Sequence, residues 1–262
     1  LIGDNDDGAA LLFGDTVHAR TRALLAAGAI LLDRPDLLGL AGEPDERTFW
    51  LCGPEAISAR ARLAGTPPYS TTGTCDGGGL GVIRTRIEPG EIIVTLRGGP
   101  FGAPPNYGHA HADMLSVTVS LQDGPFLIDP GNYVYFAESD WRRYFRSSRA
   151  HNLVLIDSTD QAAPRGRFLW GEPPRGALEV LPVECALRGT LRWRCGRTLV
   201  HQTRAVHASP TGLTVRDAVV APGAHEALFV WHIHPSWAVR SGPDGEILGE
   251  RDGLRVRLSP PA

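Results

Sequence analysis

Beyond about residue 65 the sequence consists of short runs of alternating apolar and polar residues, separated by glycine, proline and aspartate. Each run has the length of a strand, and the turn-forming residues between the runs leave no room for long helices. Strand-length runs in this succession predict a mainly β fold, a large antiparallel β-sandwich. The clearest runs are residues 81–86, 91–97, 116–122, 126–129, 153–157, 187–193, 212–217, 228–232 and 254–258.

The sequence predicts the type of turn that connects the runs 116–122 and 126–129. Asp123 and Gly124 predict a tight hairpin turn, because an Asp-Gly pair tolerates the positive φ angles of a type I′ turn. The runs 116–122 and 126–129 are therefore expected to pair as antiparallel neighbours.

The first 65 residues differ, because their runs are rich in alanine and leucine, which favour helices. We expect a helix over 17–32, capped by Thr16 and ended by Arg34-Pro35, and further helices over 45–51 and 54–64. Three short helices make a poor core alone. The expected division is therefore 1–65, the last helices of a larger helical domain, and 66–262, the sandwich.

Charge and hydropathy narrow the function classes. The net charge is −3 over 262 residues, which is too small to argue for a nucleic-acid partner, and we expect none. No run reaches the roughly 18 apolar residues of a membrane-spanning helix. The chain opens on Leu1 without a signal segment, so we expect that the sequence once continued upstream.

The four cysteines form no CxxC pair, which argues against a thiolate zinc site or a redox motif. Cys185 and Cys195 could face each other across a hairpin. Alternatively, the cysteines are free, buried small residues. Both interpretations leave the redox compartment open.

Residues 108–113 read GHAHAD and are the first candidate site. On a strand, His109 and His111 would share one face and could give two imidazoles to one metal, or one to a metal and one to a substrate. The hairpin return brings Asp129 beside His111, and a buried carboxylate is costly unless it is paired or metal-bound. With His151, these residues predict a zinc site with an open position; ordinary structural polar residues are the alternative.

Residues 141–149 carry four arginines interleaved with aromatic residues. One interpretation is a solvated loop with its charges outward. The other is a binding site for carboxylates or sulfates, because the guanidinium fork matches planar anions and aromatic rings suit sugars.

Three segments now resemble a known family: GHAHAD at 108–113, FLIDPGNYVYF at 126–136 and WRRYFRSSRAHNLVLID at 141–157. They are similar to the C-terminal domain of the heparinase II/III family, which includes heparin, heparan and alginate lyases. IGDNDDG at 2–8 and WHIHP at 231–235 also resemble segments of these proteins. The family fold implies an α/α toroid followed by an antiparallel super-sandwich, of which this chain would hold the sandwich and the last toroid helices.

The resemblance also implies roles for single residues. It implies that His109 is the catalytic-site histidine and that Tyr144 or Tyr135 is a tyrosine near the substrate. We take Tyr144 as catalytic. The zinc ligands would be His111, Asp129 and His151, and the substrate-binding residues Tyr135, Arg142, Arg146 and Asn152. The family's main catalytic tyrosine lies on the toroid, and no such toroid site is visible in this sequence.

The implied function is a polysaccharide lyase that cleaves an anionic, uronic-acid-containing polysaccharide by β-elimination, in the periplasm or after secretion. A non-catalytic carbohydrate-binding or envelope-assembly module of the same fold is the main alternative. A cupin-like iron oxygenase would need a glutamate soon after the HxH pair, and residues 114–117 have none. A calcium site at residues 3–8 lacks the EF-hand spacing.

Overall fold

The computed structural model describes Asp4 and residues 20–34, 37, 41, 46–54, 56, 58, 72–75, 78–87, 90–122, 124–136 and 139–260. The chain divides into two compact units, Asp7–Tyr69 and the combination of Leu1–Asp6 with Ser70–Ala262. No helix among the described residues is long and apolar enough to span a bilayer.

The smaller unit contains α1 (Arg20–Leu31) and α3 (Glu46–Cys52). Small buried side chains of α1, such as Ala26 and Ala29, allow close packing, and the Cys52 thiol lies 3.9 Å from the carbonyl oxygen of Ala27. The helix predicted over 17–32 ends one residue early, and residues 16–19 lie outside the described residues, as does most of 54–64. α3 occupies the position of the helix predicted over 45–51.

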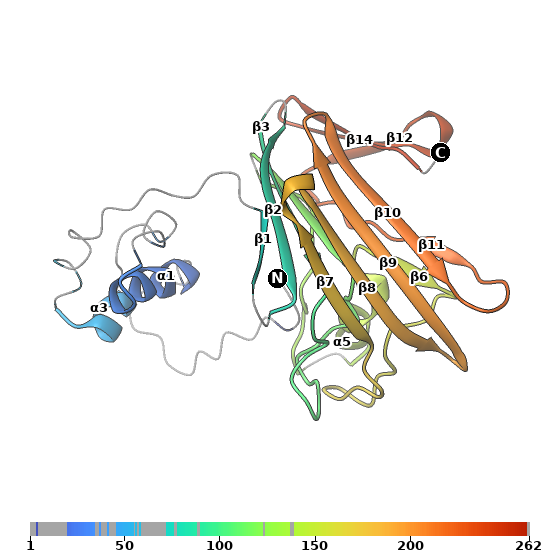
Figure 1. Ribbon diagram of the computed structural model, residues 1–262, viewed down its shortest axis with the longest axis horizontal. Coiled ribbons are helices and arrows are strands. Elements are labelled where there is room, and N and C mark those ends of the chain that lie inside the picture. Colours follow the sequence, from blue (N-terminus) through green and yellow to red (C-terminus); the bar gives the residue numbers. More distant parts are fainter. Residues whose placement is uncertain are drawn as a thin grey trace. The chain divides into compact units, whose positions relative to one another are not determined.

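The larger unit is built on two antiparallel sheets, with strand orders β1-β2-β3-β4-β5 and β10-β9-β8-β7 (Figure 1). This confirms the mainly β, antiparallel sandwich. The first sheet contains β1 (Thr72–Cys75), β2 (Leu80–Ile87), β3 (Gly90–Arg97), β4 (Val117–Leu121) and β5 (Gly124–Leu127). The second contains β7 (Arg175–Leu181), β8 (Ala186–Cys195), β9 (Thr198–Ser209) and β10 (Gly212–Val220).

Two smaller sheets and four short helices complete the unit. One sheet pairs β6 (Val154–Ile156) with β11 (Ala227–Phe229), and the other joins β12 (Ala238–Ser241), β13 (Ile247–Arg251) and β14 (Leu254–Leu258). The helices are α5 (Ser139–Arg146) and three 3-10 turns, Ser148–Ala150, Pro182–Glu184 and Pro243–Gly245.

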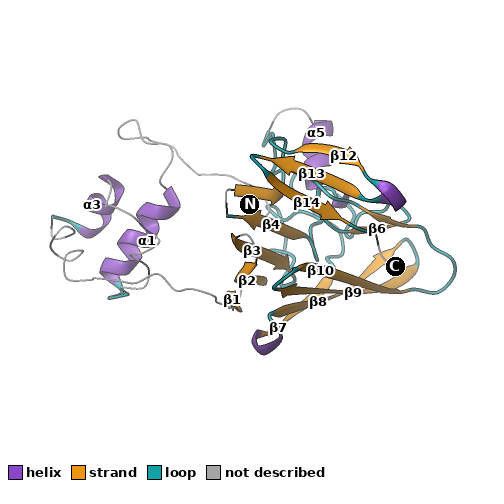
Figure 2. Ribbon diagram, turned by 90° about the horizontal axis from the view of Figure 1, so that it is seen from above, coloured by secondary structure: helices purple, strands orange, loops and turns teal. Residues whose placement is uncertain are grey.

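The main core lies between the two large sheets. Val94 and Leu96 of β3 are fully buried with Leu187 of β8 and Val206 of β9, because alternate side chains of each strand point inward. The sheet β12–β14, labelled beside β4 in Figure 2, packs on the same core through residues such as Leu254.

A second core lies beneath the long loops and supports the candidate site. Phe101, Ala112 and Met114 of the loop between β3 and β4 are buried with Trp170 and with Trp193 of β8. The segment that carries the histidines therefore rests on a packed apolar layer.

The predicted β4–β5 hairpin is confirmed, since Leu121 pairs with Gly124 in antiparallel register; Asp123 itself lies outside the described residues. Residues 108–113, in which a strand would have put both histidines on one face, form a loop. The predicted loop at 141–149 is largely helix α5. A Cys185–Cys195 contact is also excluded, because the two residues lie at opposite ends of β8, roughly 30 Å apart at strand spacing.

Arg204 of β9 connects the sandwich to the loops above it. Its fully buried guanidinium forms a bidentate pair with Asp217, at 2.7 and 2.9 Å, and donates to the carbonyl oxygens of Leu115 and Asn152. One buried cation thus satisfies two loop carbonyls that face the core.

We expect Arg204→Ala to lower the free energy of unfolding by about 3–5 kcal/mol, because it leaves Asp217 and two carbonyls without their partner. Urea denaturation measures the loss. Arg188→Ala, which removes an exposed pair with Glu179, is the control and should cost less than about 1 kcal/mol. Equal losses in both variants would contradict the role of Arg204.

Candidate functional site

The histidine loop, residues 108–116, is held from three sides by hydrogen bonds. The amide of Ala112 donates to the carbonyl of Arg146 at 2.9 Å, and the Ser148 hydroxyl donates to the carbonyl of Ala112 at 2.8 Å. The side-chain amide of Gln161 both accepts from the backbone of Met114 and donates to it. These bonds fix the backbone on which His109 and His111 stand.

The two histidines of this loop have different environments. The His109 side chain is 69% exposed, whereas that of His111 is fully buried, so the predicted shared strand face is wrong. They are nevertheless connected by Asp4. Its carboxylate lies 3.3 Å from His109 Nδ1 and 3.1 Å from His111 Nε2, and its amide donates to the carbonyl of His109.

Asp4 is itself held by Arg142 of α5. The two guanidinium nitrogens Nη1 and Nη2 each donate to one carboxylate oxygen, the second at 2.6 Å, and both side chains are buried. Burial alone would raise the pKa of Asp4, but the hydrogen bonds from His111 and Arg142 outweigh it and hold the pKa at about 2. Asp4 is therefore a carboxylate at neutral pH.

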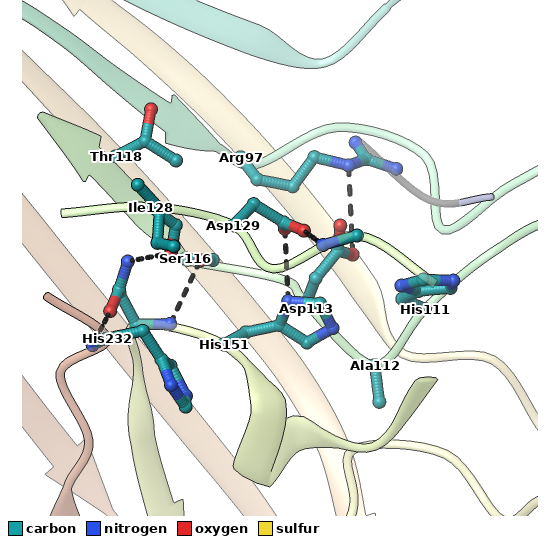
Figure 3. A network of polar contacts seen from close by, with 12 residues as sticks. Arg97, His111, Ala112, Asp113, Ser116, Thr118, Ile128, Asp129, His151 and His232 are labelled. Carbon is teal, nitrogen blue, oxygen red and sulfur yellow. Dashed lines mark hydrogen bonds and ion pairs between the residues drawn. The ribbon is translucent and has the colours of Figure 1, made fainter. Parts of the chain in front are cut away.

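The three predicted zinc ligands lie next to one another (Figure 3). His151 Nδ1 is 3.0 Å from Asp129 Oδ2, the His111 and His151 ring centroids are 5.4 Å apart, and Asp129 Oδ1 accepts from the amide of Gly131. Burial would lower the pKa of His151, but the Asp129 carboxylate reverses this and raises it. Burial lowers the pKa of His111, against the opposing effect of Asp4.

The free ring nitrogens test whether a metal would fit. His111 Nδ1 and His151 Nε2 are buried and have no hydrogen-bond partner. A neutral His111 that donates Nε2–H to Asp4 leaves its Nδ1 lone pair available, and metal-binding histidines have such a carboxylate behind them. Two imidazoles therefore fit a metal. Asp129 hydrogen-bonds the opposite nitrogen of His151, and no group of three His, Cys, Asp or Glu within the described ranges is arranged to hold an ion.

Tyr135 lies beside His109. Its hydroxyl is 3.2 Å from His109 Nδ1, and the two rings are stacked at 12°. The Arg142 guanidinium carbon lies 5.3 Å from the centre of the Tyr135 ring. His109, Tyr135 and Arg142 thus form one cluster around the Asp4 carboxylate.

The other predicted residues lie differently. Tyr144 is partly exposed on α5, and its ring contacts Trp141 and Phe145. Arg146 is buried, and it donates to the carbonyls of Ala110 and Arg167. Asn152 is also buried: its amide nitrogen donates to the carbonyls of Val117 and Ile128, and its oxygen accepts from the amide of His232. Their assigned roles in substrate binding or catalysis stay predictions.

The family described as "Heparinase II/III-like, C-terminal" matches residues 73–260. This chain belongs to that family. The match covers all three sheets of the sandwich that contribute to the main core, together with the histidine loop and α5.

Solved structures of heparin-lyase type share the fold. A heparinase III with methylated lysines is 15% identical, with a TM-score of 0.67 over 98% of this chain and 35% of its own. The heparan sulfate lyase HepC from Pedobacter heparinus is also 15% identical, with a TM-score of 0.64 over 94% of this chain and 35% of its own. The chain thus spans about a third of each of these proteins. No curated protein matches the sequence.

Asp4 is the site residue that the sequence analysis missed. It lies in the IGDNDDG segment, which resembled a family segment, but nothing in the sequence connects it to Arg142, 138 positions later. The ion pair between Arg97 and Asp113, at 3.9 Å, was missed for the same reason, and so were the hydrogen bonds between the Gln161 side chain and the backbone of Met114. Each contact joins residues far apart in the chain.

We expect strong coupling between Asp4 and Arg142 in a double-mutant cycle of unfolding free energies. Asp4→Asn or Arg142→Met alone should cost about 3–5 kcal/mol, because each leaves a buried charge, and the double variant should cost much less than the sum. The half-exposed Arg84–Glu91 pair is the control cycle, with coupling of about 1 kcal/mol or less. Additive losses at Asp4 and Arg142 would refute the coupling.

Proposed function

We propose that this chain supplies the sandwich side of the active site of a polysaccharide lyase, which cleaves a uronic-acid-containing anionic polysaccharide by β-elimination. Family membership and the shared fold support the lyase class. The observation that carries the chemistry is the exposed His109, whose Nδ1 is within reach of both a buried carboxylate and a tyrosine hydroxyl. Since the solved lyases are about three times longer, we assign the activity to a longer protein that contains this chain.

β-Elimination makes three demands on a site. A base removes the C5 proton of the uronate, an acid protonates the leaving O4, and the substrate carboxylate is neutralised as the enolate develops. Histidine and tyrosine are suited to the two proton transfers at neutral pH.

His109 is the proposed proton-transfer group of this half-site. Its Nδ1 lies 3.3 Å from the Asp4 carboxylate and is hydrogen-bonded to the Tyr135 hydroxyl, which leaves Nε2 as the nitrogen that meets the substrate; no bond to Nε2 occurs among the described residues. Tyr135 is the second proposed group, because its hydroxyl lies 3.2 Å from the same ring. Tyr144 remains a candidate through the family resemblance alone.

The predicted zinc also belongs to this proposal. His111 and His151 offer free ring nitrogens, and Asp129 would complete the set by exchanging its hydrogen bond to His151 for the ion. Bound there, the ion would supply positive charge that holds three separate loop segments together. The proton transfers proposed above involve His109 and Tyr135 only.

A lyase that acts on an extracellular polymer works in the periplasm or after secretion, and we include that location in the proposal. The competing function is non-catalytic carbohydrate binding. An exposed aromatic cluster beside the site favours it, because aromatic faces stack on sugar rings. The cluster consists of Tyr133, Trp141 and Tyr144, and the exposed Phe136 contacts Tyr135.

The activity test uses the full protein and a panel of alginate, heparan sulfate, hyaluronan and chondroitin, with neutral glucans as controls. We expect growth of ultraviolet absorbance from an unsaturated uronate on at least one anionic polymer. His109→Ala should lower the rate about 100-fold or more, the usual size of an acid–base contribution. Activity confined to neutral glucans, or full activity of the variant, would overturn the proposal, and binding without cleavage would favour the non-catalytic function.

Removal of single hydroxyl groups distinguishes the tyrosines. The geometry favours a large loss of kcat, about 100-fold, for Tyr135→Phe. Tyr144→Phe tests the family-based assignment, and Tyr133→Phe is the control, because its ring contacts need no hydroxyl. If Tyr135→Phe behaves like the control, Tyr135 transfers no proton.

The metal is tested by elemental analysis of the purified chain after dialysis. We expect about one zinc per chain. His111→Ala and Asp129→Ala should each lose the zinc and lower Tm as a chelator does. The control is His234→Ala, because the hydrogen bonds of the His234 side chain within the described ranges go to Ser236, outside the cluster. Zinc content that is equal in all variants would contradict the assigned ligands.

A further inference from the structure

The arginines of α5 line a different cavity from His109. The cavity beside His109 has a volume of about 390 Å3 and is bordered by Arg97, Phe101, His111 and Asp113. A second cavity, of about 520 Å3, is lined by Arg142, Arg143, Arg146, Asp160, Arg167 and Trp170. We call this second space the basic cavity.

The charges around the basic cavity are unbalanced. Arg142 is neutralised by Asp4, but among the residues that the structure describes no carboxylate forms an ion pair with Arg143, Arg146 or Arg167. The one acidic lining residue, Asp160, accepts a hydrogen bond from the amide of Ser148 at 2.8 Å. Three guanidinium groups without a carboxylate partner thus face a space with a single acidic group.

Arg146 is the innermost of the three. It is 2% exposed and lies 4.5 Å from the ring centre of Trp170, with two of its nitrogens donating to the carbonyls of Ala110 and Arg167. Its remaining nitrogen, Nη2, is buried and has no partner. A buried cationic donor without a partner lowers the stability of the fold, so an acceptor bound at this nitrogen would be stabilising.

The shape of the ligand follows from the number of donors. A carboxylate has two oxygens and pairs well with one guanidinium fork. A tetrahedral oxyanion has three or four oxygens directed apart, and it can accept from several forks at once. Arg143 and Arg167 are exposed and long enough to adjust to such a group, while Arg146 is fixed by Trp170.

We propose that this cavity is an anion-binding site for a sulfate-type tetrahedral group, with Arg146 at its inner wall and Arg143 and Arg167 at its mouth. The site is independent of the proposed lyase chemistry, because neither His109 nor Tyr135 lines it. The group can come from a free anion or from a sulfated saccharide.

The test is a titration of the purified chain with inorganic sulfate, followed by the Nε–Hε NMR signals of arginine at constant ionic strength. We expect saturable shifts of Arg143, Arg146 and Arg167. Arg143→Ala and Arg167→Ala should each weaken binding about tenfold, which corresponds to one charge-assisted hydrogen bond. Both residues are exposed, so the variants should fold, and circular dichroism checks this.

The matched control is Arg240→Ala, which removes the same charge from an exposed position outside the cavity and should leave binding unchanged. Acetate should bind at least tenfold more weakly than sulfate. Tighter binding of glucosamine 6-sulfate than of sulfate would support a saccharide source, and equal binding a free anion. Non-saturable shifts, equal weakening by Arg240→Ala, or equal affinity for acetate would overturn the proposal. His109→Ala should bind sulfate normally, so failure of the lyase proposal leaves this result intact.

Discussion

The candidate site depends on one buried carboxylate, that of Asp4. It hydrogen-bonds to Arg142 of α5 and to the buried His111 and lies 3.3 Å from the exposed His109, so it connects its own segment to the histidine loop and to α5. A buried carboxylate is stable only with such partners, and its low pKa reflects them. The same bonds decide which nitrogen of each histidine is occupied. Asp4 thereby makes the Nδ1 atom of His111 available inside the protein and the Nε2 atom of His109 available outside it.

The loops around Asp4 have little regular structure, so their backbone groups need partners other than strand neighbours. Polar side chains of neighbouring loops and of strand β9 provide them. Asn152 connects Val117, Ile128 and His232, Gln161 connects to Met114, and Arg204 reaches the carbonyls of Leu115 and Asn152. The Asn152 side chain therefore hydrogen-bonds backbone groups, although Asn152 is next to His151 in the sequence. A site on loops becomes rigid when buried hydrogen bonds tie the loops to one another and to the sheet.

The sequence predicted the features that depend on neighbouring residues. The Asp123-Gly124 turn predicted the β4–β5 hairpin, and apolar alternation predicted runs such as β3 and β14. β9 was missed because Gln202 and Arg204 occupy inward positions where the pattern requires apolar residues; both are satisfied by partners that the sequence does not reveal, Trp193 and Asp217. His109 and His111 fit a strand pattern equally well, but their segment has no strand partner. The near neighbours His111, Asp129 and His151 were anticipated from the motif, whereas the pairing of Asp4 with Arg142 needed the fold.

Helix α5 explains how one arginine-rich segment takes part in two different environments. Arg142 and Arg146 are four residues apart and so lie on one buried face, while Trp141 and Phe145, also four apart, contact each other on another. Arg142 borders the basic cavity, yet its donors are directed to Asp4 on the side of His109. It therefore lies between the His109 cluster, where we propose proton transfer, and the cavity with unpaired positive charge. The helix fixes this division, because residues four positions apart share one of its faces.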